Sequence, residues 1–187
     1  MKKLTTYSVV IMIVLLTQCG HSKKEDGVKE AEAINKQNFD TKQSRQESEF
    51  VVDAVAGNYA EIEMAQLAIN KSANDEVRSL ARMLKKEHTE LLTQLKGFAN
   101  KRGIAISLEE KEEDHGDLKD LSKKEEPGFD EKWCKEMVNS HEKAIKNFEA
   151  TWDKTNDLEL KEWIYNTLPG FRKHLDKLKQ CDERLVE

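Results

Sequence analysis

The sequence predicts an all-α protein whose long helical segments form a four-helix bundle, and two observations carry this prediction. Only two prolines and eight glycines interrupt 187 residues, and no stretch sustains the alternation of apolar and polar residues that marks a half-buried strand. Apolar residues recur instead at steps of three and four, which places them on one face of a helix. A chain of this length fits one domain with appendages.

Charge is spread evenly along the chain. Charged residues make up 36% of it, the formal net charge is −5, and lysine and glutamate are mixed throughout. Such a mixture is typical of solvated helix faces. A surface that binds nucleic acid needs clustered positive charge, so the composition argues against a nucleic-acid partner.

The N-terminus has the pattern of a lipoprotein signal peptide over residues 1–18. Two lysines precede an apolar run over residues 9–16, which is too short to span a bilayer. The run leads into LTQC, which resembles a bacterial lipobox, where Cys19 would carry lipid and become the mature N-terminus. Gln18 departs from the small residue usual before that cysteine, so two other readings stay open: an ordinary signal peptide with a chance cysteine, and a retained membrane anchor.

Residues 19–43 are predicted to form a flexible tether. They are almost wholly polar and hold too little apolar surface to offset the entropy lost on ordering. As a loose coil they would reach roughly 25–30 Å. The tripeptide KED at residues 24–26 resembles a short basic-then-acidic signal that sends some lipoproteins to the cell surface. We therefore expect a cell-envelope protein, lipid-anchored to the outer membrane and either periplasmic or surface-exposed.

The bundle domain is expected over residues 44–187. Its four segments run over about residues 44–71, 75–101, 129–154 and 158–184, and each is about 40 Å long. The short breaks SAND and TND join them into two hairpins, and Asn74 or Asp75 in the first break is a natural N-cap. Two tight hairpins and one long connection define a four-helix bundle.

The long connection covers residues 104–128. Leu118 and Leu121 give it two apolar positions, with which one short helix could pack against the bundle. The connection is long enough either to run the full length of the bundle or to loop back, and the sequence leaves both topologies open.

Three histidines interrupt the apolar stripes. His88 lies on the second segment, His141 on the third and His174 on the fourth, each where the stripe calls for an apolar residue. His141 and His174 are equally far from a centre beside Asp157, at the end of the second break. Glu61 and His88 are equally far from a centre between Asn74 and Asp75 in the first break. Antiparallel neighbours at equal distances from their turn lie at one height, so each hairpin is expected to place its polar pair near the middle of the bundle.

Three imidazoles and one carboxylate meeting in a bundle core are plausible ligands for one transition-metal ion, namely zinc, iron, manganese or copper. The competing hypothesis is a buried polar network, in which Glu61 accepts hydrogen bonds from the histidines and specifies helix register. Two classes of protein follow from this choice. One is a metal- or small-ligand-binding envelope lipoprotein, and the other is a structural lipoprotein that contacts envelope protein partners.

The helical segments also resemble a known family. The elements EFVVDAVAGNYAEIEMAQLA, VRSLARMLKKEHTELLTQLK, FDEKWCKEMVNSHEKAIKNFE and LKEWIYNTLPGFRKHLDKL, over about residues 48–180, resemble the bacterial family labelled domain of unknown function 4142. The resemblance implies an exported, often lipid-anchored helical bundle grouped with ferritin-like folds. It implies no activity, because the family's activity is not established.

A ferritin-like grouping suggests two iron ions, and the sequence argues against them. Di-iron bundles use Glu-x-x-His motifs, but the residues three positions before the histidines here are lysine, valine and phenylalanine. No nucleophile elbow, phosphate-binding loop or haem-attachment motif occurs either. The metal hypothesis is therefore a mononuclear, histidine-rich site, and the sequence does not favour an enzyme.

Cys134 and Cys181 are the two cysteines that remain once Cys19 is lipidated. Each lies seven residues, two helical turns, from a core histidine, and both are equally far from the turn between their helices. They are expected to face each other and, in an oxidising compartment, to form a disulfide. Two buried free thiols, or thiol ligands to a softer metal, are the alternatives.

Overall fold

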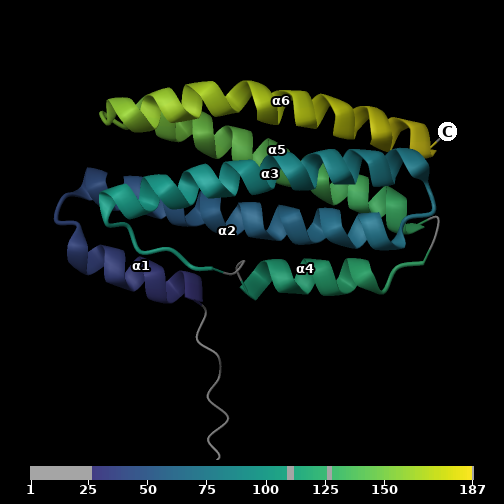
Figure 1. Cartoon of the computed structure of the whole chain (residues 1–187), viewed down its shortest axis with the longest axis horizontal. Coiled ribbons are helices and arrows are strands. Elements are labelled where there is room, and N and C mark those ends of the chain that lie inside the picture. The colour runs from purple at the N-terminus through teal and green to yellow at the C-terminus, as the bar shows by residue number, and fades with distance from the viewer. Residues whose placement is uncertain (1–26, 109–111, 126–127, 187) are drawn as a thin grey trace, which may run out of the picture.

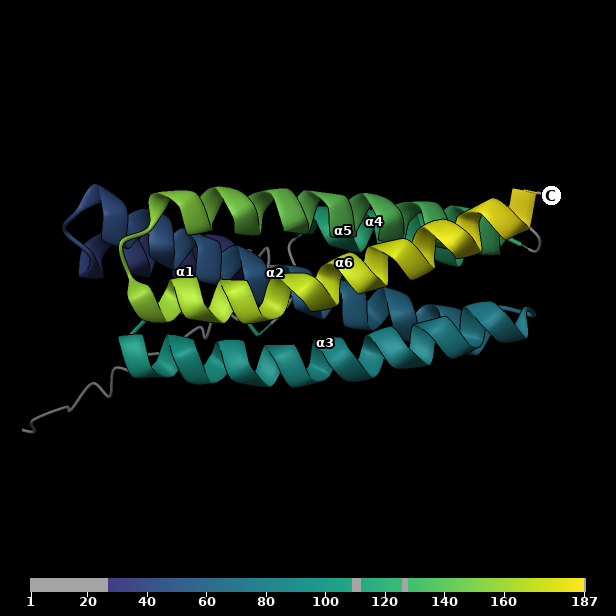
Figure 2. The ribbon, with the colours of Figure 1, turned by 90° about the horizontal axis from the view of Figure 1, so that it is seen from above.

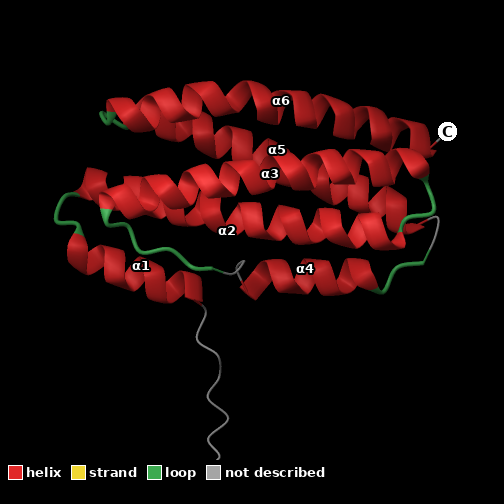
Figure 3. Ribbon diagram, viewed as in Figure 1, coloured by secondary structure: helices red, strands yellow, loops and turns green. Residues whose placement is uncertain are grey.

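The computed structural model describes residues 27–108, 112–125 and 128–186, and within these ranges it contains six helices and no strand (Figures 1 and 3). Helices make up 88% of the described residues, so the prediction of an all-α protein is confirmed. The helices are α1 (Gly27–Asn38), α2 (Lys42–Lys71), α3 (Asp75–Arg102), α4 (Glu112–Ser122), α5 (Gly128–Lys154) and α6 (Leu158–Val186).

The four long helices, α2, α3, α5 and α6, form two hairpins at the predicted breaks. In the first turn, the side chain of Asn74 accepts hydrogen bonds from two backbone N–H groups at the start of α3. In the second, Asp157 accepts two such bonds at the start of α6. Both side chains satisfy donors that a helix start leaves free, so each turn has its own N-cap. Gly103 ends α3 in the left-handed conformation, with φ at 64°, which glycine adopts without a Cβ clash.

The connection between the hairpins runs along the long helices, with α4 packed against α2 and α5 (Figure 1). Contacts at the two ends of the molecule fix the helix directions. Arg102 at the end of α3 pairs with Asp157 at the start of α6, and Arg184 at the end of α6 pairs with Glu76 at the start of α3. Lys71 at the end of α2 lies over the ring of Phe129 at the start of α5. Hence α2 and α6 run one way, and α3 and α5 run the other way (Figure 2).

A polar layer divides the apolar core into two clusters. The cluster toward the start of α2 includes Phe50 and Phe148, and the opposite cluster includes Trp133 and Leu178. On each of three helices a histidine lies between members of the two clusters. The flanking pairs are Leu84 and Leu92 around His88, Met137 and Ile145 around His141, and Phe171 and Leu178 around His174. The apolar stripes therefore continue on both sides of one buried polar layer.

The structure corrects the expected tether over residues 19–43. Residues 27–38 form α1, which packs against α2, and α2 itself already begins at Lys42. One narrow face of α1 buries Val28, Ala31 and Asn35. The side chain of Asn35 donates to the carbonyl of Ala105 and accepts from its backbone N–H, both at 2.8 Å. Composition hid this helix, because its buried face is only three residues wide and one of them is an asparagine.

The short helix expected in the long connection is α4, whose Leu121 is fully buried while Leu118 is partly buried. The predicted signal peptide and Cys19 lie outside the described residues. Within the described part of the chain, no helix is both long enough and apolar enough to cross a membrane.

Candidate metal centre

Each of the four long helices contributes one side chain to the polar layer. Glu61 comes from α2, His88 from α3, His141 from α5 and His174 from α6. Their exposed fractions are 5%, 1%, 0% and 4%, in the same order. The structure thus brings together all four residues that the sequence selected as candidate ligands.

The three histidine side chains are within reach of a single ion. One ring nitrogen of each histidine lies within 4.8 Å of the corresponding nitrogens of the other two. The Nε2 atom of His141 is 3.4 Å from the Nδ1 atom of His174, and the Nε2 atom of His88 is 2.9 Å from Oε2 of Glu61. A tetrahedral ion with bonds of about 2.05 Å separates its ligand atoms by about 3.3 Å. Shifts of about an ångström would bring the three ring nitrogens to such an ion. Glu61 lies beside them, with its Oε1 atom 3.3 Å from Nδ1 of His141.

The outward-facing nitrogen of His88 is held by Asn58. His88 Nδ1 lies 2.9 Å from the side-chain oxygen of Asn58, whose amide nitrogen donates at 2.7 Å to the carbonyl of Ala54. That second bond fixes which end of the amide faces the ring, because turning it over would set two oxygens against each other. Asn58 therefore accepts, and the proton of His88 is on Nδ1.

The other two histidines are fixed in the same way. The Nδ1 atom of His141 lies 2.9 Å from the carbonyl oxygen of Met137, and the Nε2 atom of His174 lies 2.7 Å from a carboxylate oxygen of Glu87. Both oxygens can only accept, so both ring nitrogens donate. In a neutral imidazole the second nitrogen then carries a lone pair, and in these rings that is Nε2 of His141 and Nδ1 of His174.

Three lone pairs therefore meet in one small volume. With both rings neutral and their outer nitrogens donating, His141 and His174 direct theirs at each other across a 3.4 Å contact that then holds no proton. His88 directs its own at Glu61. The contact between His88 and Glu61 has the separation of an ion pair but lacks hydrogen-bond geometry. Among the described residues neither His88 Nε2 nor Glu61 Oε2 has a hydrogen-bond partner. Histidine ligands of metals usually donate their other nitrogen to a carbonyl, a carboxylate or a water, as these rings do.

The pKa shifts in the polar layer also fit a metal site. Burial raises the pKa of Glu61, but the rings of His141 and His88 and the hydroxyl of Ser140 together outweigh it and bring that pKa to about 2. Burial lowers the pKa of His141 and of His174, against the opposing effects of Glu61 and Glu87. The layer is therefore expected to hold the Glu61 carboxylate beside two imidazoles, of His141 and His174, that favour the neutral form, and these are the protonation states that bind a metal ion.

Three residues that form hydrogen bonds with the candidate ligands are only weakly indicated by the sequence. Asn58 lies three residues before Glu61 and so on the same face of α2, and Ser140, next to His141, donates to Glu61. Glu87 supports His174, whereas Glu142 pairs at the surface with Lys179 at 2.7 Å. Helix spacing could have indicated Asn58, but only the fold brings α3 close enough to α6 for Glu87.

Cys134 and Cys181 also meet as expected, across α5 and α6. Both are buried, and their sulfur atoms lie 2.8 Å apart as two free thiols. The hydrogen bond with Cys181 and burial both raise the pKa of Cys134. The predicted disulfide is thus absent from this structure and stays a prediction.

The chain matches the model of one protein family, domain of unknown function (DUF4142), over residues 32–181. Because the match covers most of its length, the chain belongs to this family, and the resemblance found in the sequence is confirmed. No curated protein and no solved structure matches the chain.

Proposed function

We propose that the protein binds one transition-metal ion through His88, His141 and His174, with Glu61 as the fourth ligand or as the balancing charge. The observation that carries the proposal is the direction of the three rings. Each has its outer N–H bonded to an oxygen that can only accept, and one ring nitrogen of each lies within 4.8 Å of those of the other two in the buried layer.

The donor set narrows the choice of ion. Imidazole suits zinc, iron and copper, and a carboxylate adds manganese to these candidates. With a single carboxylate inside the layer, the site lacks the bridging acids of a di-iron centre. We therefore propose a mononuclear site, held in a ferritin-like four-helix bundle formed by α2, α3, α5 and α6.

Elemental analysis of protein purified without a histidine tag tests the proposal. Wild-type protein is expected to hold close to one equivalent of metal, and a His88→Ala/His141→Ala double variant is expected to hold little. Sub-stoichiometric metal in both proteins, before and after incubation with zinc, iron(II), manganese and copper(II) salts, would end the metal-binding proposal.

The second candidate function is a structural or interaction lipoprotein, in which the same layer only holds helix register. The hydrogen bonds from His174 to Glu87 and from Ser140 to Glu61 favour it, because they tie α6 to α3 and α5 to α2 without any ion. Its outer helix faces would then contact envelope proteins.

We also propose that Cys19 is lipidated and anchors the chain to the outer membrane, on its periplasmic or its outer side. Eight Cα–Cα steps separate Cys19 from Gly27 at the start of α1, and they span at most about 28 Å. As a loose coil the same eight steps would reach roughly 14–17 Å, less than the roughly 25–30 Å expected for a coil of residues 19–43, so the helical domain would lie closer to the membrane. Labelling of cells with an alkyne fatty acid should mark the wild type, and equal labelling of Cys19→Ala would refute the anchor.

A further inference from the structure

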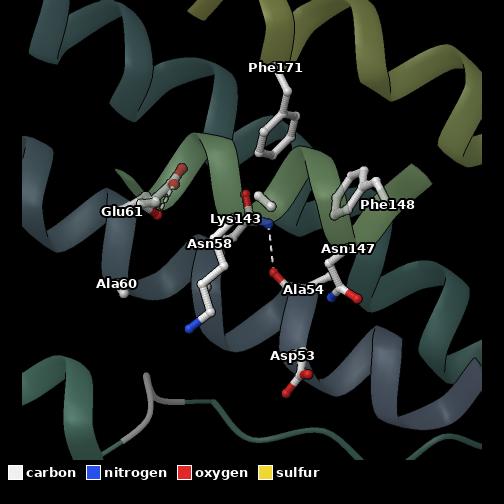
Figure 4. Close-up of a pocket in the computed structure, with 12 residues that line it drawn as sticks. Asp53, Ala54, Asn58, Ala60, Glu61, Lys143, Asn147, Phe148 and Phe171 are labelled. Atoms are coloured by element: carbon white, nitrogen blue, oxygen red, sulfur yellow. Dashed lines mark hydrogen bonds between the residues drawn. The ribbon is translucent and has the colours of Figure 1, made fainter. Parts of the chain in front are cut away.

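A cavity of about 420 Å³ adjoins the candidate metal centre on the side of α2 and α5. Small side chains on α2 leave the space open, and Ala54, Gly57 and Ala60 line it (Figure 4). Residues of α5 and Phe171 of α6 form the remaining walls. A volume of this size is in the range of pockets that bind small molecules.

The cavity and the candidate metal centre share a wall. Of the four candidate ligands only Glu61 lines the cavity, together with Asn58, which holds His88. Glu61 is 5% exposed, and its Oε2 atom has no hydrogen-bond partner among the described residues. The carboxylate therefore stands between the cavity and the three imidazoles, where a molecule in the cavity could reach the ion.

The two sides of the cavity differ in chemistry. The rings of Phe148 and Phe171, with centroids 5.0 Å apart, form an apolar side. Lys143 and Asp53 extend on the other side (Figure 4). With a divalent ion and neutral imidazoles in place, the charges of the ion and Lys143 are balanced by those of Glu61, Asp53 and Glu87, which contacts His174. The positive groups that a molecule in the cavity would meet are the ion and Lys143. An anion with an apolar body matches both features.

We propose that this cavity binds a small organic carboxylate, whose carboxyl group reaches the metal ion beside Glu61 and whose apolar part packs on Phe148 and Phe171. The inference rests on the proposed metal binding and adds to it a class of ligand. A metal site that binds a molecule from solution keeps or opens one coordination position for it. In this site Glu61 would be the protein group at that position.

Two glycines provide a matched pair of variants. A Cβ built at Gly57 or at Gly97 meets no atom within 4 Å, and both glycines lie within long helices. Leucine at either place is therefore expected to leave the fold intact and to improve helix propensity by up to about 1 kcal/mol. Only Gly57 lines the cavity, so only Gly57→Leu fills it.

The test uses full-length protein loaded with cobalt(II), whose visible spectrum reports its ligands, and benzoate as the probe. Benzoate should change the spectrum saturably in wild type and in Gly97→Leu. In Gly57→Leu its affinity should fall by about tenfold or more with unchanged cobalt content, and Lys143→Gln should weaken it severalfold. If wild-type protein takes up no cobalt, the proposed function fails and this inference fails with it. Cobalt-loaded protein that ignores benzoate, or that binds it equally well in Gly57→Leu, overturns the inference alone.

Discussion

Three hydrogen bonds at the residue scale decide what the buried histidines can do. Asn58, the carbonyl of Met137 and Glu87 each accept a hydrogen bond from the outer N–H of one ring. A buried histidine with a purely structural role needs a partner for both nitrogens, since an unpaired buried polar atom costs about 1–3 kcal/mol. Here the inner nitrogens face one another and Glu61, and a cation relieves that arrangement.

Glu87 offers a test of this support, because it contacts His174 without being a candidate ligand. Glu87→Ala is expected to lower metal affinity by about tenfold to a hundredfold, the usual cost of losing such a partner. Glu87→Gln keeps a side-chain oxygen that can accept from the ring and should lose much less. Isothermal titration with zinc measures both.

Glu90→Ala is the control for that measurement, since Glu90 is an exposed glutamate on the same helix. If Glu87→Ala binds zinc as tightly as Glu90→Ala does, His174 does not depend on Glu87 for its orientation.

The two short turns at the element scale explain how separate helices place their polar side chains in one layer. Asn74 and Asp157 start α3 and α6 at fixed residues, so positions along each hairpin are paired by their distance from the turn. That pairing brings Glu61 to His88 and His141 to His174. The same pairing, two helical turns away, brings Cys134 to Cys181.

The cysteine pair is expected to oxidise when the protein is exported to an oxidising compartment. Each thiol loses a proton, two electrons pass to the oxidant, and a bond forms between the two sulfur atoms. Closing a loop of this length stabilises a protein by about 4 kcal/mol in the chain-entropy model. Intact-mass measurement of unreduced protein should show a loss of two hydrogens, and chemical denaturation with and without reductant should show the stability difference. Cys134→Ser provides the control, and alkylation of both thiols in unreduced wild type would contradict the expectation.

Helix α1 allows a separate test, because a substitution at its buried asparagine lowers the stability of the protein only if the helix is packed and not a flexible tether. Asn35→Ala removes both hydrogen bonds to Ala105 and leaves that half-buried backbone without its partner. We expect a loss of about 1–3 kcal/mol in the free energy of unfolding, measured by urea denaturation. Asn38→Ala, at an exposed position of the same helix, should change little. Equal free energies of unfolding for the two variants would mean that α1 does not pack stably against the rest of the domain.

Much of the helical architecture of the whole molecule could be predicted from the sequence, and the features that could not be predicted were missed for physical reasons. The hairpins, the turn residues and the four polar positions follow from local rules of helix spacing and capping, which residues near in sequence determine. The position of α4 depends on its contacts with α2 and α5, and the relative directions of the hairpins depend on contacts such as Lys71 with Phe129. Periodicity carries no information about either. The supporting role of Glu87 and the burial of Asn35 also depend on partners 87 and 70 residues away.

Stability of the whole molecule separates the metal site from a polar network. An ion that binds only the folded state stabilises it by about 2.7 kcal/mol at a concentration one hundred times its Kd. For a domain of this size that is a rise of roughly 5–10 °C in Tm. We expect this rise for wild type with added zinc and no rise for His141→Leu.

In metal-free protein the comparison is different, because leucine removes one of the three crowded lone pairs and fills a similar volume. If the layer exists for an ion, metal-free His141→Leu should be within about 1 kcal/mol of wild type or more stable. If the layer is a satisfied network, the same substitution should cost about 1–3 kcal/mol, and added zinc should leave the Tm of both proteins unchanged.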